Sequence, residues 1–236
     1  MLNKFINKET FMPSYLSIFF NPFFFIRRGI YEGVKDKVVD FKGKILDFGC
    51  GSKPYESLFV NAEEYIGVDF EPIEASKNPK IDIFYNGKTL PFPDNHFDYI
   101  FCTEVLEHLF NKEELLPELN RVLKTGGMAL FTFPFAWPEH AQPYDYARYT
   151  TYSSKFIFEK YNFKIKSIEK SGNFVEVIFQ FIIFYIFSII PTENTKIKML
   201  FTLPFAFVFN IIGKICSIIL PKQKDLYLNN IVLVQK

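Results

Sequence analysis

Short apolar runs alternate with amphipathic stretches across the middle of the chain. Runs that are rich in β-branched or aromatic residues, and are bounded by Gly, Pro, Asp or Asn, predict strands. These runs cover residues 44–48, 64–70, 81–85, 97–102, 128–133 and 163–169. Helical periodicity predicts helices at 53–60, 104–109, 112–123 and 153–161. Because strands that alternate with helices form right-handed crossover units, we expect a doubly wound, mainly parallel α/β sheet.

Two segments depart from this alternation. Residues 1–40 form an aromatic leader that turns helical near its end, and residues 173–222 hold two almost continuously apolar stretches joined by a polar turn. The end of the chain returns to strand character, which predicts a seventh strand. We therefore expect four parts: an N-terminal aromatic helical cap (1–40), an α/β core (41–172), a hydrophobic helical hairpin inserted before the last strand (173–222) and the final core strand (223–236).

Composition narrows the class of protein. The 236 residues carry 27 Lys and Arg against 26 Asp and Glu, a formal net charge of +1, which argues against a nucleic-acid partner. Three cysteines without close spacing support neither a disulfide framework nor a cysteine-based zinc site, and they indicate a reducing, cytoplasmic compartment. The 31 phenylalanines are the unusual feature, and many of them lie in the leader and in the apolar hairpin.

A glycine loop carries the strongest chemical signal. The loop 47–52, DFGCGS, directly follows the first predicted strand and precedes a helix that Pro54 can start. Its two glycines let the backbone turn sharply and approach a ligand closely. Asp69 ends the next strand, where a carboxylate can accept both ribose hydroxyls of a nucleoside. Pro54 stands where a dinucleotide site needs a third small residue, which disfavours a nucleotide-dependent oxidoreductase.

Four motifs follow one another between Lys44 and Pro134: KILDFGCGSKPY, EYIGVDF, LPFPDNHFDYIFCTEVLEHL and ELNRVLKTGGMALFTFP. In this order they resemble the class I S-adenosylmethionine-dependent methyltransferases, in particular the type 11 group. The resemblance implies a Rossmann-like sheet and a core, 41–172, that binds S-adenosylmethionine and catalyses methyl transfer. It also implies cofactor-binding residues: Asp47, Gly49, Cys50 and Gly51 around the methionine part, Asp69 at the ribose, Phe70 against the adenine, Asn86 at the adenine amino group, and Thr103 in the next loop.

A polar loop after the fifth core strand offers candidate catalytic groups. Residues 134–150 concentrate His, Asp, Arg and Tyr at the edge of the sheet where the glycine loop lies. We interpret His140 as the general base, Asp145 or Glu139 as the group that orients it, and Arg148 as a partner for an anionic substrate group. The alternative is a structural network in which Arg148 pairs with Asp145.

Two other groups favour structural interpretations. Glu104, Glu107 and His108 lie close together on an expected helix, but a metal site needs further ligands, so we predict no metal. Cys50 has no base beside it in the sequence and is interpreted as a small packed residue rather than a nucleophile.

The acceptor is defined only by class. The loop 134–150 resembles loops of family members from cell-surface polysaccharide and lipid-linked sugar pathways, which implies a small or lipid-linked acceptor. Methylation of oxygen, helped by a base, is the expected reaction. Two rival functions stay open: a catalytically degenerate methyltransferase fold that acts as a membrane-associated scaffold, and the less favoured nucleotide-dependent oxidoreductase.

The apolar hairpin has three interpretations. The residues that interrupt its two segments, 174–190 and 199–220, are Glu176, Gln180, Pro204, Asn210 and Lys214. Neither segment is therefore an uninterrupted membrane span. We favour peripheral contact of residues 174–220 with a membrane, over a soluble lid or dimerisation patch and over true spanning. The expected location is the cytoplasm, at the inner face of the membrane.

Overall fold

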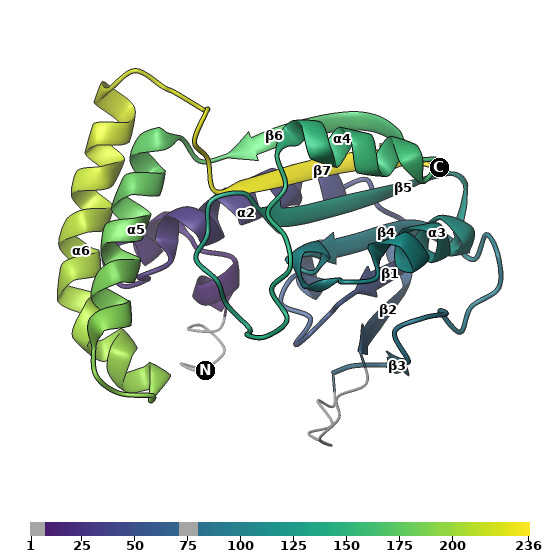
Figure 1. Ribbon diagram of the computed structural model, residues 1–236, viewed down its shortest axis with the longest axis horizontal. Helices are drawn as coiled ribbons and strands as arrows, with labels where there is room; N and C mark the ends of the chain where they lie inside the picture. Colours follow the sequence, from purple (N-terminus) through teal and green to yellow (C-terminus); the bar gives the residue numbers. More distant parts are fainter. Residues whose placement is uncertain (1–7, 71–79) are drawn as a thin grey trace. The chain divides into compact units, whose positions relative to one another are not determined.

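A computed structural model describes residues 8–70 and 80–236 (Figure 1). The chain divides into two compact units. We call residues 33–169 and 230–236 the sheet unit, and residues 1–32 and 170–229 the helical unit. The units meet at 32/33, 169/170 and 229/230, and the four-part division expected from the sequence stays a prediction.

One seven-stranded sheet forms the fold, in the order β3-β2-β1-β4-β5-β7-β6. Its strands are β1 (Gly43–Phe48), β2 (Ala62–Phe70), β3 (Ile83–Tyr85), β4 (Phe97–Thr103), β5 (Leu123–Pro134), β6 (Lys164–Ser171) and β7 (Asn229–Gln235). Strands β3, β2, β1, β4 and β5 pair in parallel. Lys236 exchanges backbone hydrogen bonds with Gly126 and Gly127 at the start of β5, so β7 runs in the opposite direction. The mainly parallel, seven-stranded α/β prediction is confirmed.

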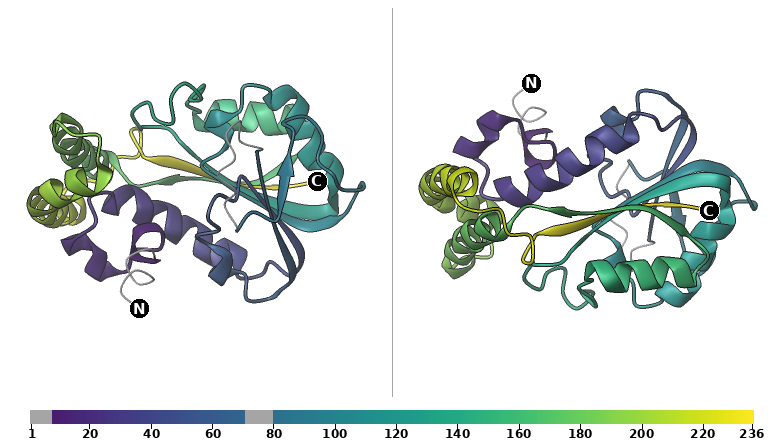
Figure 2. Two further views of the ribbon diagram at one scale, coloured as in Figure 1. Left: turned by 90° about the horizontal axis from the view of Figure 1, so that it is seen from below. Right: turned by 90° about the horizontal axis from the view of Figure 1, so that it is seen from above.

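Helices cover the sheet on both faces. Helices α3 (Lys112–Val122) and α4 (Thr151–Lys160) lie on one face, and the end of α2 (Phe24–Val38) lies on the other (Figure 2). The apolar core packs between α3, α4 and the strands and includes fully buried Phe131, Phe133 and Phe158. On the opposite face, Gly33 leaves room for Ile231, because a Cβ at that position would overlap the Ile231 side chain.

Two predicted helices are only single turns. The segment 53–60 forms the short 3-10 turn η2 (Glu56–Leu58), and 104–109 forms η3 (Leu106–His108). Each follows a residue in the left-handed region, Lys53 with φ 51° and Glu104 with φ 55°. A left-handed residue interrupts the right-handed helical path, so the prediction that Pro54 starts a full helix is wrong.

The helical unit contains the predicted hydrophobic hairpin. Helices α5 (Phe174–Ile189) and α6 (Thr195–Ile219) form an antiparallel pair, and the 3-10 helix η1 (Tyr15–Phe19) contacts α6 (Figure 1). Asn173 and Asn194 cap the two helices by accepting backbone N–H groups of the first turn. Among the described helices, α6 is long and apolar enough to cross a membrane by length and composition.

Polar side chains occupy the interior of the helical unit. The residues in question are Ser17, Asn173, Gln180, Thr202, Asn210 and Ser217, all buried. The Gln180 amide donates to Pro22 O at 2.9 Å, and the Asn210 amide donates to the carbonyls of Ile18 and Asn21, both at 3.0 Å. The outer positions are apolar instead: Ile178, Tyr185, Ile189, Leu200, Phe201, Ile218 and Ile219 are all exposed. Several residues that interrupt the apolar segments in the sequence therefore face inward.

Candidate functional site

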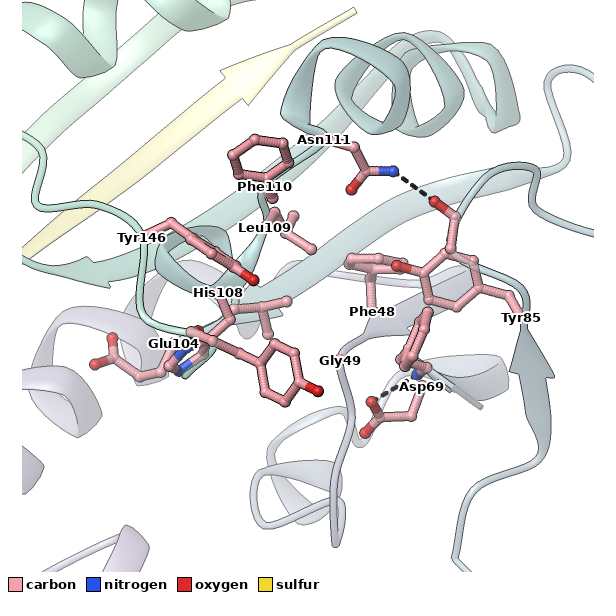
Figure 3. Close-up of a pocket in the computed structure, with 14 residues that line it drawn as sticks. Phe48, Gly49, Asp69, Tyr85, Glu104, His108, Leu109, Phe110, Asn111 and Tyr146 are labelled. Atoms are coloured by element: carbon pink, nitrogen blue, oxygen red, sulfur yellow. Dashed lines mark hydrogen bonds between the residues drawn. The ribbon is translucent and has the colours of Figure 1, made fainter. Parts of the chain in front are cut away.

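A pocket of about 750 Å³ lies at the carboxyl ends of β1, β2 and β4 (Figure 3). Its volume falls within the range of roughly 300–1,000 Å³ typical of small-molecule sites. The residues that line it are Phe48, Gly49, Asp69, Phe70, Tyr85, Gly87, Glu104, Val105, His108, Leu109, Phe110, Asn111, Tyr144 and Tyr146. The strand ends and the polar loop thus meet at one site, as expected for an open parallel sheet.

The glycine loop forms one wall because its backbone turns tightly at the end of β1. Gly49 and Gly51 have φ values of 71° and 50°, and Gly49 N donates to Val68 O at 2.8 Å. A Cβ at position 49 would overlap the Val105 side chain. Glycine at this position therefore satisfies both the left-handed turn and the close approach to Val105.

Asp69 joins the loop to the pocket. Its Oδ2 accepts Gly51 N and its Oδ1 accepts Phe70 N, both at 2.8 Å. Each carboxylate oxygen has a second lone pair, so the group can still accept hydrogen bonds from a ligand in the pocket. Asp69 thus lies where the sequence places a ribose-binding carboxylate.

Asp47 lies buried beneath the loop and outside the pocket lining. Tyr65 donates its hydroxyl to Asp47 Oδ2 at 2.6 Å. Burial raises the pKa of Asp47 to about 7, although the Tyr65 hydrogen bond and the charge of Lys53 oppose this shift. With this pKa, the carboxyl changes charge near neutral pH.

An ion pair that sequence reasoning missed supports the loop from below. Lys53 is buried and pairs with Asp82, whose carboxylate also accepts Gly67 N at 2.7 Å. A side chain at Gly67 would overlap Lys53 and Cys50. Burial also raises the pKa of Cys50 to about 12, so this thiol stays protonated and is a packed residue. No local sequence signal links Lys53 to Asp82, because the two are paired only by the fold.

The adenine side of the predicted site is an aromatic and backbone surface. Phe70 is half-exposed, and its ring lies 6.0 Å from that of Tyr85. Asn86 Oδ1 accepts the N–H groups of Lys88 and Thr89 and so holds the turn, while the neighbouring Gly87 lines the pocket. The predicted role of Asn86 at the adenine amino group stays a prediction.

The residues that follow β4 and the polar loop 134–150 form the remaining wall of the pocket. Thr103 ends β4 outside the lining, and its neighbour Glu104 faces the pocket (Figure 3). His108 also lines the pocket and contacts the carbonyl of Tyr144 through Nδ1 at 2.6 Å. The His140 ring lies 4.8 Å from the His108 ring, behind this wall.

His140 and Asp145 come together as the sequence predicts. Asp145 Oδ2 accepts His140 N at 2.9 Å and lies 3.3 Å from His140 Nδ1. Burial, followed by the neighbouring His108, lowers the pKa of His140, so the imidazole is neutral at physiological pH. Glu139, the other candidate for orienting His140, is near Gln142 instead, at 3.5 Å.

Arg148 does not have the predicted substrate-binding role. Its guanidinium makes two bonds of 2.6 Å to the Asp145 carboxylate, which lowers the pKa of Asp145. It also donates to the carbonyls of Trp137, Pro138 and Ala147. These bonds use all five guanidinium N–H groups, so Arg148 stabilises the loop and has no donor left for an anion.

Glu107 is the least satisfied buried group near the pocket. Its side chain is fully buried, and neither carboxylate oxygen has a hydrogen-bond partner among the described residues. Oε1 lies 3.8 Å from His108 Nε2 and 3.9 Å from His140 Nε2. Burial, reinforced by the charge of Glu104, raises the pKa of Glu107 well above its ordinary value.

The middle of the chain is similar to known proteins. Residues 46–131 match a family described as "Methyltransferase domain". An uncharacterized protein of Methanocaldococcus jannaschii is 31% identical over 120 residues, which are 49% of this chain and 52% of that protein. A ubiquinone/menaquinone biosynthesis C-methyltransferase of a Shewanella species is 33% identical over 90 residues, 38% of this chain and 30% of the enzyme. The chain thus spans about half, or less, of the length of these relatives.

Solved structures share the fold. An S-adenosylmethionine-dependent methyltransferase from Archaeoglobus fulgidus superimposes with a TM-score of 0.53 at 18% identity, covering 99% of each chain. The [4+2]-cyclase SpnF superimposes with a TM-score of 0.55 at 16% identity, covering 88% of this chain and 80% of the cyclase. At these identities the likeness concerns the fold, and the names of the two proteins differ in the activity they state.

Proposed function

We propose that this chain is a class I S-adenosylmethionine-dependent methyltransferase, which transfers a methyl group from S-adenosylmethionine to a small or lipid-linked acceptor. S-adenosylmethionine is the cofactor of this family, as the sequence motifs predict. The observation that carries the proposal is the Asp69 carboxylate, which is tied to the glycine loop and faces the pocket.

The described residues fit this cofactor. Asp69 would accept the ribose hydroxyls, the backbone of Gly49 to Gly51 would surround the amino-acid part, and Phe70 would pack against the adenine. Asp47, with its pKa near 7, would take its charged form beside the ammonium group. The cofactor supplies an electrophilic methyl group on a sulfonium, so the protein must align the acceptor, exclude water and remove a proton.

The acceptor side of the pocket favours oxygen as the methylated atom. His140, oriented by Asp145, stays our candidate for taking a hydroxyl proton, because its lowered pKa favours the neutral imidazole that can accept one. Similarity to a C-methyltransferase over 90 residues supports carbon as the second candidate. Exposed Tyr144 and Tyr146 rim this side and suit an acceptor with apolar or sugar surface.

Peripheral contact of the helical unit with the inner face of a membrane is a second part of the proposal. It is supported by the apolar outer positions of α5 and α6 and by the inward direction of their polar side chains. Glu176 and Lys214, two of the residues that interrupt the apolar segments, neutralise one another across the hairpin at 3.3 Å. A helical surface of this kind is stabilised by lipid rather than by water.

The cofactor assignment is tested with Asp69→Asn, which keeps the shape of the side chain and removes its charge. Titration calorimetry with S-adenosylhomocysteine is expected to show affinity weakened at least about tenfold, because charge-assisted hydrogen bonds to the ribose are lost. Asp40→Asn, at an exposed acid of the same unit, serves as the matched control and keeps full affinity. Equal affinity in both variants would reject the assignment.

The reaction itself is tested by transfer of a labelled methyl group into cell extracts separated into lipid and water-soluble fractions. Label in a methyl ether identifies oxygen, and label in a C-methyl group identifies the second candidate. Binding of S-adenosylhomocysteine without transfer into either fraction would favour the non-enzymatic scaffold instead.

Membrane contact is tested by flotation with phosphatidylglycerol-containing vesicles. Phe201→Ser, at an exposed position of α6, is expected to reduce the floated fraction. Phe156→Ser, at an equally exposed position of α4 in the sheet unit, is the matched control and floats like the unchanged chain. Flotation that does not differ between the two variants would contradict the proposal.

A further inference from the structure

Three side chains at the pocket wall bring possible metal-ligand atoms close together. Glu107, His108 and His140 each offer one such atom, and these atoms all lie within 4.8 Å of one another. The Glu107 carboxylate is buried, and both of its oxygens lack hydrogen-bond partners among residues 8–70 and 80–236. A carboxylate in this condition is costly for the fold unless a cation or proton donor accompanies it.

Polar partners at Nδ1 orient both histidines for metal binding through Nε2. His108 Nδ1 contacts the Tyr144 carbonyl at 2.6 Å, and His140 Nδ1 faces both Pro138 O and Asp145 Oδ2 at 3.3 Å. A carbonyl or carboxylate partner at Nδ1 accepts a hydrogen bond from the proton there, which leaves Nε2 of each ring as the ligand atom. Each Nε2 is the atom nearest the Glu107 carboxylate, at 3.8 Å and 3.9 Å. Metal-binding histidines are commonly oriented by such outer partners.

We propose that Glu107, His108 and His140 bind a divalent transition-metal ion beside the pocket. Metal–ligand bonds of about 2.1 Å bring donor atoms to roughly 3.0–3.4 Å from one another, so each donor atom needs to move by less than about 1 Å. Two imidazoles and one carboxylate favour Zn²⁺, Mn²⁺, Fe²⁺ or Co²⁺, whereas Ca²⁺ and Mg²⁺ prefer all-oxygen ligands. The nearby Glu104 carboxylate adds negative charge that attracts the ion.

Three protein ligands leave coordination positions open, which is typical of catalytic rather than structural metal sites. Because His108 is both a proposed ligand and a residue of the pocket lining (Figure 3), we infer that an open position is available to an acceptor in the pocket. This use of the ion rests on the proposed methyl transfer. An acceptor hydroxyl bound to the ion loses its proton to solvent water because the ion lowers its pKa. The oxygen then forms a bond to the methyl carbon, and the carbon–sulfur bond breaks with its electron pair left on sulfur. Here His140 is a metal ligand, and the ion replaces the free-base role that the metal-independent reaction assigns to His140, so the two roles are alternatives that the metal titration separates.

The chain offers a sharp test because it has three histidines and two of them are in the site. The chelator-treated full chain is titrated with Co²⁺, and its visible absorption is followed. One equivalent is expected to bind, and Glu107→Gln and His140→Gln are each expected to weaken binding at least about tenfold. His96→Gln is the matched control, because His96 lies in the turn before β4 against Phe92, and it binds Co²⁺ like the unchanged chain.

Binding of S-adenosylhomocysteine is measured on every variant to confirm that the pocket is folded. Variants that keep this binding but lose Co²⁺ support the site. Failure of the folded, unchanged chain to bind Co²⁺, Zn²⁺ or Mn²⁺ saturably, or equal Co²⁺ binding by Glu107→Gln, overturns it. If the unchanged chain does not bind S-adenosylhomocysteine, this contradicts the proposed function but not the metal site. Methyl transfer that is unaffected by removal of a bound ion would overturn its role at the acceptor.

Discussion

The helical unit and the sheet unit both bury apolar side chains, but they use their buried polar groups differently. The sheet unit has an aromatic and aliphatic core, while the helical unit encloses amides and hydroxyls and exposes isoleucine, leucine and phenylalanine. In the helical unit, both ends of the Gln180 amide bond to backbone groups of the leader. The Asn210 amide nitrogen donates to two leader carbonyls, while its Oδ1 has no partner among the described residues. In the sheet unit, Asp47 has one side-chain partner and Glu107 has none among the described residues.

This difference separates buried polar groups that serve folding from those that serve a ligand. A polar group that folding needs finds its hydrogen-bond partners within the chain, because an unsatisfied buried group is costly. A group that stays underpartnered beside a pocket persists at a cost to stability, which is typical of a functional site. We therefore expect substitution of the hydrogen-bonded amides in the helical unit to lower the free energy of unfolding. Substitution of the underpartnered acids in the sheet unit should raise it.

The apolar core of the sheet unit should show the largest effect. Phe131→Ala removes a fully buried ring that lies 4.7 Å from the Phe158 ring, and it should lower the free energy of unfolding by about 3–5 kcal/mol. Urea unfolding in mild detergent measures this change. Phe156→Ala, on the exposed side of α4, should change the value by less than about 0.5 kcal/mol. Similar losses in both variants would contradict the assignment of the core.

Asp47→Asn should show that the buried Asp47 carboxyl lowers the free energy of unfolding as the pH rises toward neutral. The native pKa of about 7 lies above the ordinary value of 3.8, so the folded chain holds a proton that the unfolded chain has released between these values. This contribution to stability is complete below about pH 4 and is lost as the pH rises to 7. Between pH 5 and pH 8, the variant should therefore gain about 3 kcal/mol relative to the unchanged chain in the absence of ligand. Parallel pH profiles of urea unfolding for the two chains would rule out the raised pKa.

Gln180→Leu should destabilise the chain, although leucine is an apolar residue and α5 is an apolar helix. Gln180 accepts Ile26 N at 3.3 Å and donates to Pro22 O at 2.9 Å, so leucine leaves two buried backbone groups without this partner. The free energy of unfolding should fall by about 2 kcal/mol. Ile178→Leu, at an exposed position of α5, is the control and should be close to neutral. If Gln180→Leu raised the free energy of unfolding, the buried amides of the helical unit would not stabilise the fold as we infer.

Most of the sheet, and the side of the site formed by the glycine loop and Asp69, could be predicted from the sequence. Every strand position, α3, α4 and the two apolar helices follow from hydrophobic periodicity, which reports on neighbours within a few residues. The glycine loop and Asp69 were also predictable, because the loop is contiguous in sequence and strand ends meet at one sheet edge. The helix expected at 53–60 is only the short turn η2, and local periodicity predicted neither the left-handed conformation of Lys53 nor its ion pair with Asp82.

By itself, then, the sequence determined the alternation of strands and helices, the cofactor loop and the presence of two apolar helices. Only the tertiary structure decided which polar side chains face one another. It assigned all donors of Arg148 to the loop, turned Gln180 toward the leader, and brought His140 to Glu107 across 33 positions of chain. The physical reason is that periodicity encodes which face of an element is buried, whereas the partner of a polar side chain depends on packing between distant elements.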